Sequence, residues 1–109
     1  MNKQLKFTYQ DKDYCLEFTR KSVELMERNG FRAIDIESKP MTTLPALFAG
    51  AFLANHRFVK KETIDEIFSK MTNKSDLIGK LAEMYNEPIM VLVDEPEESE
   101  GNVGWTASW

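Results

Sequence analysis

Only a few residues of this 109-residue chain have side chains that could carry out catalysis. The chain has one cysteine, Cys15, and one histidine, His56, far apart in the sequence. Nucleophilic catalysis needs a base within hydrogen-bonding reach of the nucleophile, and no local spacing provides such a pair. Cys15 also has no neighbouring His or Lys to activate it. We therefore expect an inert thiol and a structural or surface histidine near a helix end.

Carboxylates offer the other source of chemistry. Glu62, Asp65 and Glu66 share one face of a predicted helix and could form a cluster. Their place in the N-terminal half of that helix favours a solvated face that complements the helix dipole. One Cys and one His cannot build a multi-cysteine metal site, and the chain has no phosphate-binding glycine loop or nucleophile elbow. The sequence predicts no enzyme, no cofactor and no metal.

The net charge of −4 is concentrated near the C-terminal end of the chain. Without the five acidic residues of segment 94–100, residues 1–93 hold 14 basic and 13 acidic residues. Such a near-neutral body lacks the clustered Lys and Arg that non-specific nucleic-acid binding requires. We find neither a signal peptide nor an apolar stretch of transmembrane length, and therefore expect a cytosolic protein without membrane contact. The acidic residues of this run are Asp94, Glu95, Glu97, Glu98 and Glu100.

The first 30 residues predict a β-hairpin followed by a helix. Large apolar residues alternate with smaller or polar ones on both sides of the polar segment 10–13, so that all can share one buried face. This predicts a hairpin over 4–18, after which Thr19 suits a helix N-cap and Gly30 a helix end. The apolar residues are Leu5, Phe7, Tyr9, Tyr14, Leu16 and Phe18.

Four helices are expected in all, over residues 19–29, 43–55, 61–71 and 74–93. In the second, Pro45 is expected in the first turn, where it is tolerated, and Gly50 allows another helix to approach closely. Segment 31–40 fits a short strand or a helical turn, which Pro40 is expected to end. The predicted fold is α+β, with the hairpin packed on this helical bundle in one domain, 1–93, followed by a tail, 94–109. The expected buried face of the last helix is Leu77, Ile78, Leu81, Tyr85, Ile89 and Leu92.

Both tryptophans, Trp105 and Trp109, lie in the last five residues of the chain, on a segment too polar to fold alone. The segment either docks on its own domain or serves as a linear motif whose indoles bind in pockets of a partner. Tryptophan is enriched among the residues that dominate binding energy. We therefore take Trp105 and Trp109 as candidate partner-binding residues.

The apolar stripe of Leu44–Phe52 has two interpretations. It is either the central core helix, or it is wider than one small domain can cover. In the second case Phe48, Phe52 and Phe58 would contribute to an oligomer or partner surface. We include these three residues among the candidate partner-binding residues.

Basic residues, Arg57, Lys60 and Lys61, surround the turn between two predicted helices. A helix-turn-helix DNA reader would place basic residues there, but its recognition helix would be basic as well. The helix that follows this turn carries three acidic residues instead. No nucleic-acid partner is therefore expected.

Three segments resemble bacteriophage tail assembly chaperones. Leu16–Glu24 resembles the entry from hairpin to helix in these proteins, and Leu44–Phe52 and Asn55–Arg57 are similar to later segments. The match is closest to small siphophage and prophage proteins of Gram-positive hosts. It covers nearly the whole chain, including the tryptophan-containing end.

This resemblance implies a non-enzymatic protein that binds the long, helix-rich tape measure protein. It would keep that protein in solution while the tail tube assembles around it, acting in the cytoplasm of the host bacterium and remaining absent from the mature virion. Such chaperones are often encoded with a longer frameshifted product that recruits tail tube protein, and this chain resembles the shorter form. Coating a long target would favour a homo-oligomer. The first alternative is a structural minor tail component. The second, which the sequence favours less, is a small helix-turn-helix-like DNA-binding regulator.

Overall fold

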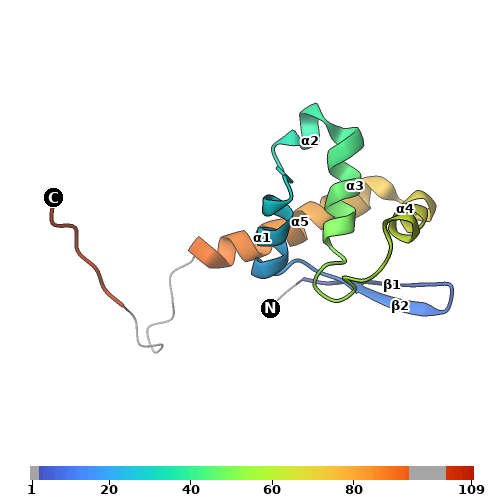
Figure 1. Ribbon diagram of the computed structural model, residues 1–109, viewed down its shortest axis with the longest axis horizontal. Coiled ribbons are helices and arrows are strands. Elements are labelled where there is room, and N and C mark those ends of the chain that lie inside the picture. Colours follow the sequence, from blue (N-terminus) through green and yellow to red (C-terminus); the bar gives the residue numbers. More distant parts are fainter. Residues whose placement is uncertain (1–2, 94–102) are drawn as a thin grey trace.

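A two-stranded antiparallel hairpin and five helices make up the fold of the computed structural model, which describes residues 3–93 and 103–109 (Figure 1). The α+β class predicted from the sequence is therefore confirmed. The helices gather on one side of the hairpin, and α5 runs along the long axis of the molecule in contact with α1 and α3. The elements are β1 (Leu5–Tyr9), β2 (Lys12–Leu16), α1 (Arg20–Arg28), α2 (Asp35–Ser38), α3 (Pro40–Gly50), α4 (Lys61–Lys70) and α5 (Lys74–Val93).

The hairpin has the expected cross-strand pairs, with Leu5 opposite Leu16 and Phe7 opposite Tyr14. Its turn is tighter than the predicted 10–13, because only Gln10 and Asp11 separate the strands. Both residues have positive φ, 50° and 62°, as a two-residue type I′ turn requires. This turn matches the natural twist of paired strands and fixes the register that directs one apolar face toward the helices.

Both ends of α1 are capped as the sequence predicts. The N–H of Ser22 donates to Oγ1 of Thr19 at 3.1 Å, and the Thr19 N–H donates back to Oγ of Ser22 at 2.9 Å. At the other end Gly30 has a φ of +93°, and the N–H of Phe31 donates to the carbonyl of Met26 at 2.9 Å. These bonds form a capping box and a Schellman motif, which satisfy backbone groups that the helix itself cannot pair.

The boundaries of α3 differ from the predicted 43–55, since the helix begins at Pro40 and ends at Gly50. Pro40 starts the helix rather than ending the preceding segment, which contains the short helix α2. Pro45 consequently lies in the helix interior and not in its first turn. The early end has a tertiary cause, because the carbonyl of Ala51 accepts a 3.2 Å hydrogen bond from the N–H of Glu17 next to β2. Residues 51–55 follow as turns.

The core lies between the hairpin and helices α1, α3, α4 and α5. Gly50 permits the close approach expected of it, since a Cβ there would lie only 2.4 Å from Cε of Met26 on α1. Phe18 meets Tyr85 of α5 edge-to-face, with 5.4 Å between ring centroids. The largest side chains with almost no exposure are Leu16, Phe18, Leu47, Phe48, Phe52, Ile67 and Leu81.

The bounds of α5 are those predicted, but its buried face is shorter. Leu77, Leu81, Met84 and Tyr85 are buried, whereas the predicted core residues Ile89 and Leu92 are exposed. A 20-residue helix is about 30 Å long, more than twice the length of the nine-residue α1 against which it packs. The last turns of α5 therefore project beyond the helical bundle (Figure 1).

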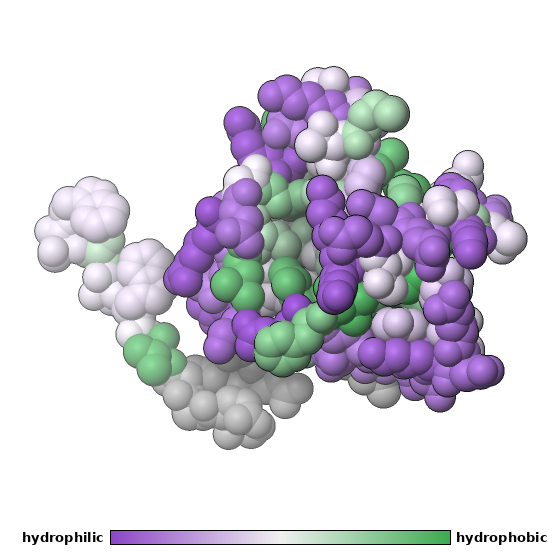
Figure 2. Space-filling model, turned by 45° about the vertical axis from the view of Figure 1, so that its right-hand side comes forward, coloured by the Kyte–Doolittle hydropathy of each residue, from purple (hydrophilic) through white to green (hydrophobic). Residues whose placement is uncertain are grey.

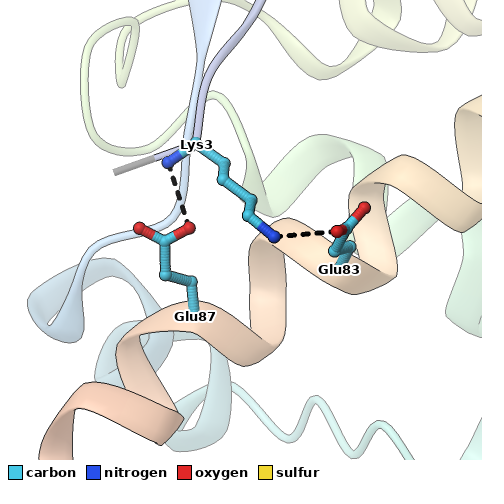
Figure 3. Close-up of polar contacts among 3 residues, drawn as sticks. All are labelled: Lys3, Glu83 and Glu87. Carbon is cyan, nitrogen blue, oxygen red and sulfur yellow. Dashed lines mark hydrogen bonds and ion pairs between the residues drawn. The ribbon is translucent and has the colours of Figure 1, made fainter. Parts of the chain in front are cut away.

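The N-terminal end of the hairpin is attached to α5 (Figure 3). Nζ of Lys3 lies 2.8 Å from Oε1 of Glu83, and the Lys3 N–H donates to Oε2 of Glu87 at 3.2 Å. The hydrogen bond from Lys3 lowers the pKa of Glu83 below its ordinary value and raises the pKa of Lys3. This exposed pair connects the two ends of the domain that are farthest apart in sequence.

None of the helices within residues 3–93 is both long enough and apolar enough to cross a membrane.

Candidate functional site

Two of the predicted partner-binding residues belong to the core. Phe48 and Phe52 are only 0% and 1% exposed, and their rings pack edge-to-face 5.2 Å apart. Phe48 also contacts Phe68 of α4, and Phe52 contacts Tyr14 of the hairpin. The prediction of a partner surface is therefore wrong for these two residues, because α4 and the hairpin together cover the stripe that seemed too wide for one domain.

Segment 55–57, one of the three on which the resemblance rests, follows α3 and is hydrogen-bonded to strand β2. Nε2 of His56 accepts a 3.0 Å hydrogen bond from the backbone N–H of Cys15, and Nδ2 of Asn55 donates to the Cys15 carbonyl at 3.1 Å. The imidazole also packs against Tyr14, with 5.1 Å between ring centroids. Because Nε2 is engaged with the backbone, His56 has a structural role, as expected. Its acceptor nitrogen pairs with a strand N–H.

The carboxylates of α4 do not converge. Glu66 accepts a hydrogen bond from the hydroxyl of Tyr9, which also accepts from Nζ of Lys70 at 3.3 Å. Glu62 and Asp65 are exposed on the same helix. Across the described ranges 3–93 and 103–109, no group of three His, Cys, Asp or Glu residues is placed to hold a metal ion. Glu66 thus links α4 to the hairpin through Tyr9.

Phe58 is the third phenylalanine among the candidate partner-binding residues. It lies on the surface and is 93% exposed. It lines an open pocket of about 730 Å³ between the hairpin and the loop that precedes α4. Basic side chains surround it: Lys12 from β2, and Arg57 and Lys60 from the loop. Tyr14 lies at the base of this pocket, with Nζ of Lys12 5.3 Å from its ring centroid. We call this pocket the basic groove.

A second exposed surface lies at the C-terminal end of α5. Five consecutive apolar residues, Ile89–Val93, are between 39% and 72% exposed. A helix with apolar residues on every side is expected in a protein core, but here this pattern lies on the surface. We call these residues the α5 apolar end.

The tryptophans lie beyond this helix end. Trp105 is 83% exposed and Trp109 is fully exposed, on a segment without helix or strand. Neither indole is docked on its own domain, and Figures 1 and 2 show the segment apart from the folded body. On the face in Figure 2, hydrophobic side chains lie in a recess framed by hydrophilic ones. The acidic run of residues 94–100, which joins α5 to this segment in the sequence, lies outside the described residues.

Sequence reasoning missed two of these features. It assigned Ile89 and Leu92 to the core because their spacing continues the buried face of α5. The signal was the unbroken run of apolar residues after Pro88, which lacks the polar face of an amphipathic helix. The contribution of Lys12 to the basic groove could not be predicted from the sequence. The groove forms only where the hairpin packs beside the loop before α4.

The sequence matches one protein family over residues 1–109, described as a domain of unknown function (DUF5055), and the chain belongs to this family. No curated protein and no solved structure matches the chain.

Proposed function

We propose that this protein is a non-enzymatic bacteriophage tail assembly chaperone that binds the tape measure protein and keeps it soluble during tail assembly. The proposal starts from the resemblance of segments 16–24, 44–52 and 55–57 to such chaperones. The structural observation that best supports it is the α5 apolar end, where five consecutive apolar residues are exposed on a well-formed helix.

The α5 apolar end suits a helical target. A tape measure protein exposes long apolar stripes until tube subunits cover it, and an exposed apolar helix can pack against such a stripe. A groove of about 360 Å³ beside it, lined by Val23, Pro88, Ile89 and Leu92 among others, offers space for a target side chain. The contact is small, so each copy would bind weakly. Weak contacts suit a chaperone that tube subunits must later displace.

The tryptophan segment adds a second contact with the same target. Trp105 and Trp109 offer large apolar faces at little entropic cost because each has only two rotatable side-chain bonds. Two contacts on one chain, and several chains on one long target, would raise the overall affinity through effective concentration. The protein would thus act as a homo-oligomer on the tape measure protein. It would work beside the tail tube protein and a longer frameshifted form of itself.

The proposal places the protein in the cytoplasm of the host bacterium and outside the mature virion. A structural minor tail component would instead remain in purified particles. Mass spectrometry of purified virions separates these two functions, because a chaperone is absent and a component is present in a fixed ratio. A DNA-binding regulator would shift duplex DNA with a strongly salt-dependent affinity.

Co-expression tests the proposal directly. The tape measure protein of the same phage or prophage is produced alone, with this chain, and with the variant Met90→Asp/Leu92→Asp. Solubility and co-purification of the tape measure protein should both rise with the wild-type chain. The variant should give little of either effect. A tape measure protein that is equally insoluble with and without the wild-type chain contradicts the proposal.

A further inference from the structure

The basic groove combines positive charge with an uncovered aromatic ring. Lys12, Arg57 and Lys60 are all exposed, and no carboxylate lines the groove with them. None of these cations forms an ion pair within the described part of the chain, where the only such pair joins Lys3 and Glu83. Phe58 stands among them with 93% of its surface exposed. The groove therefore suits a ligand that brings both negative charge and an apolar ring.

The chain itself carries a segment of that chemistry. Five acidic residues lie within positions 94–100, and Trp105 and Trp109 follow shortly after. Acidic side chains would neutralise the three cations, and an indole could cover Phe58 or stack on the guanidinium of Arg57. The remaining residues of the segment are small or polar, apart from Pro96 and Val103, and none is bulky enough to obstruct an extended peptide. Charge and ring content thus match on both sides.

We infer that the basic groove of one molecule binds the C-terminal segment 94–109 of a second copy. The segment leaves the domain at the end of α5, whereas the groove lies between β2 and the loop that precedes α4. In Figure 1 the hairpin turn and α4 lie at the side of the folded body opposite the C-terminal end of α5. Trp109 is fully exposed, so its own groove is not its binding site in this structure. Donor and acceptor on opposite ends join molecules head to tail, a heterologous contact that can be repeated from copy to copy.

This inference stands apart from the capture of the tape measure protein by the α5 apolar end, but it competes with the second contact proposed above. A tryptophan segment held in a neighbouring copy's groove cannot contact the tape measure protein at the same time. The electrostatic part of the inference predicts self-association that weakens as salt is added, because the groove cations are exposed to solvent. Its aromatic part predicts that both indoles lose water on association. Trp105 and Trp109 are the only tryptophans in the chain, so their emission reports the segment alone.

The test uses two full-length variants that each remove one side of the contact. Arg57→Glu/Lys60→Glu reverses charge in the groove but keeps the tryptophans. Trp105→Ser/Trp109→Ser keeps the groove but contains no tryptophan. Lys21→Glu/Lys39→Glu is the matched control, since it makes the same change of net charge at exposed residues outside the groove.

Sedimentation should show that the wild type and the Lys21/Lys39 control self-associate with rising concentration. The groove variant should associate at least about tenfold more weakly, because opposed like charges replace attraction. Adding the tryptophan-free variant to the groove variant should shift the tryptophan emission to shorter wavelength. The intact groove of the tryptophan-free variant then binds the tryptophan segment of the groove variant. Adding a protein that carries both sets of substitutions should cause no shift.

Several results would overturn the inference. The first is wild-type protein that stays monomeric at all concentrations. The second is a groove variant that associates as well as the Lys21/Lys39 control. The third is a blue-shifted tryptophan emission in dilute, monomeric wild type that is absent from the groove variant. Such a result would mean that the segment docks in the groove of its own molecule. If the groove substitutions abolish binding of duplex DNA and leave self-association unchanged, the groove serves nucleic acid and the inference also fails.

Discussion

Nε2 of His56 accepts a hydrogen bond from the backbone N–H of Cys15 at 3.0 Å. The only histidine and the only cysteine of the chain are therefore in contact, yet the contact uses the backbone of Cys15 and not its thiol. The bond pairs a strand N–H that no third strand reaches. It thereby holds the loop after α3 against β2, and this loop carries Arg57 and Phe58 into the basic groove.

Replacing His56 should therefore reduce stability. His56→Ala leaves the half-buried N–H of Cys15 without its acceptor and removes the ring that packs on Tyr14, which we expect to cost about 1–3 kcal/mol. Urea unfolding followed by far-UV circular dichroism measures this cost. Arg57→Ala, at the exposed neighbour, should change stability by less than about 0.5 kcal/mol. Equal stability of the two variants would mean that the histidine contact contributes nothing.

The phenylalanines provide a direct test of which aromatic side chains form the core. Phe48→Ala removes a ring that is 0% exposed, and we expect a loss of about 3–5 kcal/mol. Phe58→Ala truncates a ring that is 93% exposed and should leave the free energy of unfolding within about 0.5 kcal/mol of wild type. Thermal unfolding of both variants decides the point. A large loss at Phe58 would place that residue in the core instead.

Two glycines give a matched pair for the packing of α1 on α3. A Cβ at Gly50 would lie 2.4 Å from Cε of the buried Met26, whereas a Cβ at Gly79 on α5 would meet nothing within 4 Å. Gly50→Ala forces Met26 to move, and we expect a net cost of about 1–3 kcal/mol. Gly79→Ala should instead stabilise the protein by about 0.5–1 kcal/mol, since alanine favours a helix. Stabilisation by both substitutions would show that Met26 yields without cost.

The Lys3–Glu83 pair predicts a small dependence of stability on acid. The pKa of Glu83 is lowered in the folded protein by the hydrogen bond from Lys3. The stability that this carboxylate contributes is thus complete above its ordinary pKa and disappears as the pH falls below about 4. The pKa of Lys3 is raised, so its side of the pair is lost only at strongly alkaline pH.

Glu83→Gln removes the carboxylate whose protonation causes this loss. Its urea midpoint should fall less than that of wild type between neutral pH and pH values below about 4. Glu62→Gln, at an exposed carboxylate of α4, is the control and should follow wild type. Identical profiles for all three proteins would show that the pair does not contribute to stability.

Local signals account for the parts of this fold that the sequence predicted well. The hairpin alternation, the Thr19 cap and Gly30 each act within a few residues, and all three have their expected structure. The end of α3 was misplaced because a hydrogen bond from Glu17 to Ala51 decides it, and such a contact has no local signature.

The candidate site was harder to predict, because periodicity shows which face of a helix is apolar but not how far its neighbours extend. For Phe48 and Phe52 the sequence left a core position and a partner surface both open, and α4 and the hairpin cover them. Ile89 and Leu92 were assigned to the core although the bundle stops short of them. Both cases depend on how far the neighbouring elements extend, which only the folded arrangement determines.

The soluble fraction of the tape measure protein in the presence of matched methionine variants tests the central claim most directly. Met90 on the α5 apolar end and Met41 at the start of α3 are both exposed, by 58% and 89%. Met90→Asp should lose most of the solubilising effect, whereas Met41→Asp should retain that of wild type. Equal soluble fractions with both variants and with wild type would contradict the claim that exposed apolar surface at the end of α5 captures the target.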